Sequence, residues 1–239
     1  MARRNRSAGG ILLRRLGTLL LLGAAAVLAL QLWFLGHIVW YRWQPPASTA
    51  FMRAQLDMMR AADPQARLRH VWVPYAQISP HLKRAVIAAE DANFTEHDGV
   101  DWEAIEQAHA RNQRRGKVTH GGSTITMQLA KNLFLSGERS YLRKGQELVI
   151  AFMLEAVLSK ERILELYLNV AEWGVGVFGA EAAAQRWYRS PASRLGPAQA
   201  ARLAAMLPRP RYYDRNPGSA TLARRAETIQ RWMGAVTPP

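Results

Sequence analysis

The chain has 239 residues, of which 49% are hydrophobic and 21% are charged. This balance excludes a disordered chain, and the absence of cysteine excludes a disulfide framework, a thiolate metal cluster and a cysteine nucleophile. The 32 Lys and Arg residues against 18 Asp and Glu residues give a formal charge of +14, which predicts an anionic partner. That partner could be nucleic acid, an anionic membrane surface or a phosphate-bearing substrate.

An apolar segment near the N-terminus predicts a membrane anchor over residues 16–41, where no charged residue occurs. About 20 apolar residues in a helix are enough to cross the hydrocarbon core of a bilayer. Residues 1–15 contain five arginines and no acidic residue, so this basic segment is expected on the cytoplasmic side. A cleaved signal peptide is the alternative, but no small-x-small cleavage site follows the apolar segment. An exported domain argues against nucleic acid as the partner and favours anionic lipid.

A globular domain is expected over residues 46–239, beginning at the proline pair that ends the anchor. Apolar residues at helical spacing predict a mainly α-helical domain. The predicted helices cover residues 79–91, 101–111, a segment that includes Ile125, Leu129 and Leu133, one long helix or two in tandem over 141–170, and then 180–188, 197–207 and the end of 216–233. The β-branched segments at 71–73 and 118–119 are the only short strand candidates.

The first polar cluster, residues 90–99, places four acids and one histidine at the end of a predicted apolar helix. It could be a solvated helix terminus. Alternatively, Glu90 follows an apolar helix closely enough that desolvation would raise its pKa toward the range of a general base. We expect His97 to support the turn by hydrogen bonding. A zinc site is disfavoured, because the other five histidines are scattered along the chain.

The second cluster, residues 121–132, combines two glycines with Ser123, Gln128 and Lys131. Glycines free backbone amides to face an anion, and the hydroxyl and amine side chains add donors and positive charge. The order of lysine and hydroxyl residues does not fit a P-loop. A loop with a helix N-cap is the alternative interpretation.

The third cluster contains Arg139, Arg143, Lys144 and Glu147, in which Glu147 is spaced to pair with both Arg143 and Lys144 on one helix. On a solvated face these would be weak surface ion pairs. In a cleft, the same residues would hold one ionised carboxylate among cations that can receive a phosphate. The leucines and the isoleucine of residues 160–169 are interpreted as core, and Asn169 as a helix-end residue.

The order of these clusters resembles the peptidoglycan glycosyltransferases of family 51, and most closely the monofunctional members of that family. The matching motifs are Glu90-Asp91-x-x-Phe94-x-x-His97-x-Gly99, Gly121-Gly122-Ser123-Thr124-Ile125-Thr126-x-Gln128, Arg143-Lys144-x-x-Glu147 and Lys160-x-x-Ile163-Leu164-x-x-Tyr167-Leu168-Asn169. Weaker similarity extends the resemblance over residues 82–216. Several motifs in order arise by chance far less often than any one alone. Met127 stands where the family usually has a glutamine, and this departure concerns one polar contact.

The resemblance implies a lysozyme-like, two-lobed glycosyltransferase domain that polymerises lipid II into β-1,4-linked glycan strands and releases undecaprenyl pyrophosphate. Glu90 would be the general base for the acceptor 4-hydroxyl, and Glu147 the second carboxylate near the donor. The protein would be a single-pass protein of the bacterial inner membrane, with its catalytic domain in the periplasm. Its partners would be lipid II, the growing glycan strand, membrane lipid and proteins of cell-wall synthesis or division.

By the same resemblance, the cations would neutralise the pyrophosphate leaving group while two polar side chains orient it. The cations are Lys131, Arg139, Arg143 and Lys144, and the orienting residues are Ser123 and Gln128. No resident metal or cofactor is predicted from the residues. The resemblance leaves open a divalent cation, Mg²⁺ or Mn²⁺, at the pyrophosphate.

Two other functions remain open at this stage. A membrane-bound lytic enzyme would use Glu90 as a general acid to cut glycan, although a hydrolase has no need of a phosphate site. A catalytically inactive scaffold for cell-wall proteins is the third possibility. The length of the chain leaves no room for a penicillin-binding transpeptidase, so insensitivity to β-lactams is expected.

Overall fold

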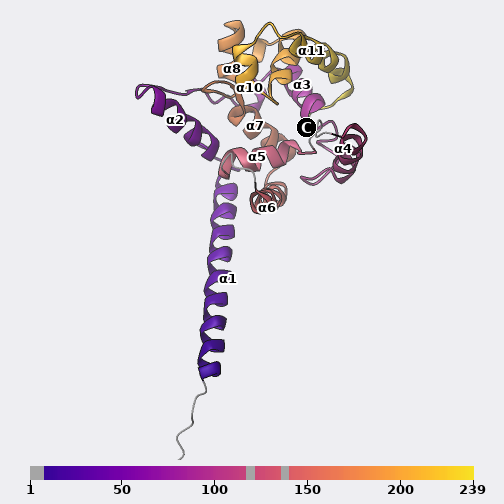
Figure 1. Ribbon diagram of the computed structural model, residues 1–239. Helices are drawn as coiled ribbons and strands as arrows, with labels where there is room; N and C mark the ends of the chain where they lie inside the picture. The colour runs from indigo at the N-terminus through magenta and orange to yellow at the C-terminus, as the bar shows by residue number, and fades with distance from the viewer. Residues whose placement is uncertain (1–7, 117–121, 136–139) are drawn as a thin grey trace, which may run out of the picture.

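The computed structural model describes residues 8–116, 122–135 and 140–239. The strand candidate at 118–119 and the predicted phosphate ligand Arg139 lie outside these residues. Helix α1, Ala8–Trp40, projects from the folded part of the chain as a single long helix (Figure 1). Its segment Leu13–Trp40 is long and apolar enough to cross a membrane. This agrees with the apolar helix expected over 16–41.

The predicted helices of the domain are present, each with ends set by local chemistry. Serine, threonine or aspartate caps the first turn of several of them, at Ser79, Asp101, Thr124, Ser140 and Ser159. The helices are α3 Pro80–Glu90, α4 Trp102–Arg115, α5 Ile125–Phe134, α6 Tyr141–Val157, α7 Lys160–Val170, α8 Ala180–Tyr188, α9 Pro197–Met206 and α11 Ala220–Trp232. The segment 141–170 therefore forms two helices and not one, with Ser159 capping the second.

Several elements were not predicted. They are helix α2 Ala50–Ala62, the short helix α10 Pro210–Arg215, the 3₁₀ turns η1 Tyr75–Gln77, η2 Ala192–Arg194 and η3 Met233–Ala235, and a three-stranded sheet of β1 Arg69–His70, β2 Glu172–Gly174 and β3 Val177–Phe178. The strand order is β1-β3-β2, with β1 parallel and β2 antiparallel to β3. The strand expected at 71–73 was wrong, because the pairing residues lie just before it.

Helix α7 lies at the centre of the core. Its Ile163, Leu164, Leu166 and Leu168 are fully buried, which confirms their interpretation as core residues. Asn169 near its end is also fully buried, and its side-chain amide pairs with the backbone N–H and C=O of Val73, each at 2.9 Å. This pairing ties the segment after β1 to the central helix and satisfies a buried amide.

The C-terminal end of α1 packs on helices α5 and α6. Phe34 is buried and lies edge-on to Phe134 of α5, with ring centroids 5.2 Å apart, and Tyr41 stacks on the same ring at 6.0 Å. The side-chain amides of Gln31 in α1 and Gln146 in α6 exchange two hydrogen bonds of 2.9 Å. In Figure 1, α5 and α6 accordingly lie at the end of the domain that meets α1, while α8 and α11 lie at the opposite end.

Candidate active site

Glu90 is the last residue of α3, a helix whose preceding turn is buried in the core. Its side chain is only 10% exposed, and it accepts a 2.9 Å hydrogen bond from Nε2 of Gln128. Arg225 of α11 approaches the same carboxylate at 3.4 Å. Burial raises the pKa of Glu90 above its ordinary value, while Gln128, Arg225 and Lys131 act in the opposite direction. A raised pKa makes this carboxylate a stronger proton acceptor, as a general base requires.

The amide of Gln128 is held in one orientation by Tyr167. The hydroxyl of Tyr167 donates to Oε1 of Gln128 at 2.9 Å, which leaves the amide nitrogen to donate to Glu90. Tyr167 is almost fully buried in α7, so its ring fixes this chain of hydrogen bonds to the core. The position of the Glu90 carboxylate is thus set by two other helices, α5 and α7.

A cavity of about 300 Å³ opens beside Glu90, between the end of α3, the start of α4 and the segment before α5. The lining includes Glu90, Asn93, Gln107 and Ser123. This volume is at the small end of those typical of small-molecule sites. A ligand can reach Glu90 through this cavity. An acid that only ended a solvated helix would not need such a cavity.

His97 supports the turn after α3, as predicted. Its Nδ1 accepts a hydrogen bond from the N–H of Gly99 at 3.2 Å, so Nε2 carries the proton and donates to Asp91 at 2.9 Å. The other oxygen of Asp91 accepts the N–H of Ile125 at 2.9 Å. This series of bonds fixes the first turn of α5 against the end of α3.

The same turn brings together three groups of the kind that bind metals. Ligand atoms of Asp91, His97 and Asp101 lie within 4.8 Å of one another, and Asp101 follows His97 by four residues. Each group is already engaged, because Asp101 caps α4 through Ala104 N–H at 2.7 Å and accepts from Asn93 at 3.0 Å. A metal here would displace the hydrogen bonds that hold the turn, so these residues do not fit a resident ion.

Glu147 forms the second charged centre of the site. Its side chain is 4% exposed and pairs with Arg143 Nη1 at 2.7 Å and with Lys144 Nζ at 2.6 Å. Lys144 also donates to the Ser123 hydroxyl at 3.0 Å, which joins α6 to the cavity beside Glu90. These are not pairs on a fully solvated helix face, since the shared carboxylate is buried.

Lys131 of α5 interacts electrostatically with both glutamates. Burial lowers its pKa, and the negative charges of Glu147 and Glu90 act against that effect. The positive charges of Arg143 and Lys144 lower the pKa of Lys131 further. One region therefore contains both glutamates, the three described cations, Ser123 and Gln128, as the sequence clusters suggested.

Comparison with known proteins shows which family the chain belongs to. The sequence model of the Transglycosylase family matches residues 57–234, which include every described site residue. The chain belongs to the transglycosylase family. The lysozyme-like helical fold expected from the motifs agrees with this membership.

Relatives named biosynthetic peptidoglycan transglycosylase match most of the chain. The protein of Herminiimonas arsenicoxydans is 57% identical over 229 residues, covering 96% of this chain and 99% of that protein. The protein of Bordetella pertussis is 62% identical over 213 residues, covering 87% and 88% of the two chains. The protein of Laribacter hongkongensis is 55% identical and covers 91% of this chain and 97% of its own length.

The departure at Met127 affects packing and not the site. Met127 is fully buried in the core, whereas the next residue, Gln128, reaches Glu90. A polar contact with a ligand is therefore not lost at this position.

Sequence reasoning missed residues whose importance depends on tertiary contacts. Arg225 is one of two adjacent arginines in α11, and nothing in its local pattern distinguishes it from Arg224. Tyr167 was named only as part of a motif, whereas in the structure it is buried and its hydroxyl orients Gln128. A tyrosine among apolar helix residues was the available signal, because a buried hydroxyl needs a partner.

Proposed function

We propose that the protein is a peptidoglycan glycosyltransferase that polymerises lipid II into β-1,4-linked glycan strands and releases undecaprenyl pyrophosphate. One observation carries the proposal. A buried glutamate with a raised pKa faces a cavity whose other side is joined, through Ser123 and Lys144, to a group of cations. Transfer from a lipid pyrophosphate requires these two features, a base for the acceptor and positive charge for the leaving group.

In the proposed reaction, Glu90 removes the proton of the acceptor 4-hydroxyl as that oxygen bonds to C1 of the donor sugar. The bond from C1 to the pyrophosphate oxygen breaks, and the leaving group takes the electron pair. Attack from the opposite face changes the α linkage to a β linkage. Gln128 holds the carboxylate of Glu90 in place through its 2.9 Å hydrogen bond.

The leaving pyrophosphate is stabilised by Lys131, Arg143 and Lys144. Glu147 acts through two of them, because its carboxylate pairs with Arg143 and Lys144 at 2.7 and 2.6 Å. We assign it a positioning role near the donor. Ser123 fixes the amine of Lys144, and Arg139 is expected to add a fourth cation.

We propose that these side chains supply most of the positive charge that the pyrophosphate needs. Arg143 and Lys144 lie near Lys131, and Glu147 is already shared by these two cations. A divalent cation, Mg²⁺ or Mn²⁺, would therefore be bound chiefly by the phosphate oxygens of the substrate. Oxygen-rich ligands suit both ions.

Helix α1 supports a location at the inner membrane, with the basic residues 1–15 in the cytoplasm and the domain of residues 46–239 in the periplasm. Phe134, which packs on the end of α1, lies one turn after Lys131 in α5. Exposed apolar side chains of α6, Leu142, Val149 and Phe152, add a lipid-facing surface beside it. The cations thus lie near the membrane surface, where a lipid pyrophosphate would be found.

Fluorescent lipid II in detergent micelles tests the proposal. The purified protein should convert it into a product of high molecular weight that muramidase digests. Release of soluble fragments from mature cell wall would instead indicate a lytic enzyme, and no reaction with either substrate would indicate a scaffold. A scaffold for division or cell-wall proteins would retain its binding partners without turnover.

A further inference from the structure

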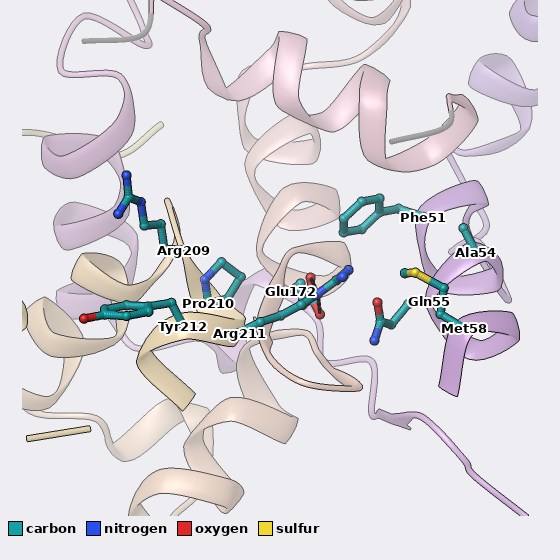
Figure 2. Close-up of a pocket in the computed structure, with 9 residues that line it drawn as sticks. All are labelled: Phe51, Ala54, Gln55, Met58, Glu172, Arg209, Pro210, Arg211 and Tyr212. Carbon is teal, nitrogen blue, oxygen red and sulfur yellow. Dashed lines mark hydrogen bonds and ion pairs between the residues drawn. The ribbon is translucent and has the colours of Figure 1, made fainter. Parts of the chain in front are cut away.

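A second cavity lies between α2, β2 and α10, and no step of the proposed reaction uses it (Figure 2). Its volume is about 610 Å³, large enough for a sugar unit of a glycan strand. The lining residues are Phe51, Ala54, Gln55, Met58, Glu172, Arg209, Pro210, Arg211 and Tyr212. Three of them, Phe51, Gln55 and Met58, repeat on one face of α2, and Figure 2 shows their side chains directed toward Arg211 and Glu172.

This α2 cavity adjoins the cation group of the candidate active site. The ring of Phe51 is approached by Lys131 Nζ at 6.0 Å from its centroid and by the guanidinium carbon of Arg211 at 5.7 Å. Lys131 belongs to the proposed pyrophosphate site, and Arg211 lines the α2 cavity. A substrate bound at Lys131 could therefore extend past Phe51 into this cavity.

The polar groups of the α2 cavity are one ion pair and one buried amide. Glu172 is buried, and both of its oxygens accept from Nε of Arg211, at 2.8 and 3.1 Å. Gln55 is only 4% exposed, yet its buried Oε1 has no hydrogen-bond partner among the described residues. A buried amide without a partner lowers stability, so its retention points to a ligand that completes it.

The residues that line the α2 cavity disfavour some classes of ligand and favour one. The charge of Arg211 is compensated by Glu172, which disfavours a simple anion site. A hydrocarbon chain is disfavoured as well, since it would leave the buried Oε1 of Gln55 without a hydrogen bond. An acetamido group offers one donor and one acceptor to the amide of Gln55, and its methyl group fits against Phe51 and Met58.

We propose that the α2 cavity binds the acetamido group of an N-acetylhexosamine unit, with Gln55 as the residue that selects it. The proposal rests on the proposed function only in taking a glycan substrate, since that substrate carries acetamido groups along its length. Arg211, held by Glu172, adds donors for the acetamido carbonyl or a neighbouring hydroxyl. Phe51 provides an apolar surface between this subsite and Lys131.

Binding of two neutral tetrasaccharides to the full chain in detergent micelles tests the proposal. N-acetylchitotetraose carries an acetamido group on each sugar, whereas cellotetraose has a hydroxyl at the same position. The wild-type protein should bind the first about 3- to 10-fold more tightly, which is the effect expected of a neutral hydrogen bond. Saturation-transfer NMR should give its strongest signal at the acetyl methyl groups. Equal affinity for the two sugars would overturn the proposal.

Gln55→Met should remove the preference while leaving cellotetraose binding unchanged. Met has nearly the same length, so the melting temperature should stay the same or rise, because an unpaired buried amide has been removed. Gln65→Leu, at an exposed position just after α2, is the matched control and should keep the preference. A Gln55→Met protein that still prefers N-acetylchitotetraose would contradict the assignment.

These measurements are independent of catalysis. Glu90→Gln should bind N-acetylchitotetraose as the wild type does, since Glu90 does not line the α2 cavity. Failure of the polymerisation assay with preserved sugar selectivity would overturn only the proposed function. Polymerisation without any sugar selectivity would overturn only the α2 subsite.

Discussion

Glu90 and Glu147 are both buried carboxylates of one site, yet their surroundings differ in charge. Glu147 is paired with Arg143 and Lys144 at short distances. Glu90 accepts its closest hydrogen bond from a neutral amide, while its nearest cation, Arg225, is 3.4 Å away and partly exposed. Burial accordingly raises the pKa of Glu90.

This difference in surrounding charge suits Glu90 to proton transfer and Glu147 to the positioning of cations. A base must exchange a proton, so a weakly compensated carboxylate such as Glu90 suits that role. A carboxylate shared by two cations holds them in one geometry, which suits a site for a leaving pyrophosphate. Substitutions of the two glutamates should therefore fail in different ways.

The largest effect is expected for Glu90→Gln, which keeps the shape of the side chain and removes its ability to accept a proton. The rate of lipid II polymerisation should fall by about 10²- to 10⁴-fold, the usual contribution of a general base. The melting temperature near neutral pH should rise. Because the pKa of Glu90 is higher in the folded state than in the unfolded chain, its ionisation destabilises the fold as pH increases through that range.

Glu96→Gln is the control for this substitution, because Glu96 is an exposed acid in the same turn. It should leave both rate and stability unchanged. Turnover of Glu90→Gln at the wild-type rate would remove the assignment of the base and with it the contrast between the two glutamates.

Glu147→Gln should have the second largest effect on rate, with the opposite effect on stability. Loss of the carboxylate leaves Arg143 and Lys144 without their shared partner, at a cost of about 1–2 kcal/mol of unfolding free energy because both cations are partly exposed. We expect a lower melting temperature and a fall in kcat/KM of about 10- to 100-fold. Thermal denaturation and lipid II kinetics at one pH measure both. Higher stability with lost activity would make Glu147 resemble Glu90 and contradict the contrast.

Most helices could be predicted from the sequence, since capping residues and apolar spacing are local signals. Ser79 and Thr124 cap α3 and α5 where the pattern indicated. Helix α2 was not predicted, because its apolar residues pack against residues that are distant in the sequence. Phe51, for example, packs near Phe178 of β3, with ring centroids 6.3 Å apart. The sheet was missed because its strands have two or three residues each.

The contacts of the site are likewise of two kinds, local ones that the sequence predicts and long-range ones that it does not. The pairing of Glu147 with Arg143 and Lys144 follows from helical spacing and could be read directly. The contacts of Glu90 with Gln128 and Arg225 join residues 38 and 135 positions apart, which no local pattern specifies. The motif resemblance located Gln128, but the contact of Arg225 with Glu90 could be recognised only in the folded structure.

Lys131→Ala tests the region between the two glutamates. Removal of the amine should weaken binding of lipid II by about 10-fold, the effect of one charge-assisted hydrogen bond, with a smaller change in kcat. Arg84→Ala, an exposed cation on α3, is the control and should bind as the wild type does. Unchanged affinity of Lys131→Ala for lipid II, measured with Glu90→Gln as an inactive background, would remove Lys131 from the pyrophosphate site.

The smallest effect is expected for Arg225→Gln, which probes the limited compensation at Glu90. Three charged groups act on Glu90: Arg225 and Lys131 lower its pKa, and Asp91 raises it. Tyr167 beside them has its own pKa raised by burial. Without Arg225 the pKa of Glu90 should rise, so the acidic limb of the rate profile should move to higher pH. The rate on that limb should fall by about two- to fivefold, as for a partly exposed ion pair.

Arg224→Gln is the matched control for that pH profile. Arg224 precedes Arg225 on α11 but is exposed and contacts Thr221 at 3.3 Å in place of Glu90. Its profile should coincide with that of the wild type, so a shift in both variants would reflect only the loss of surface charge. A shift confined to Arg225→Gln would show that the contact with Arg225 lowers the pKa of Glu90, whereas Glu147 is paired with two cations at once.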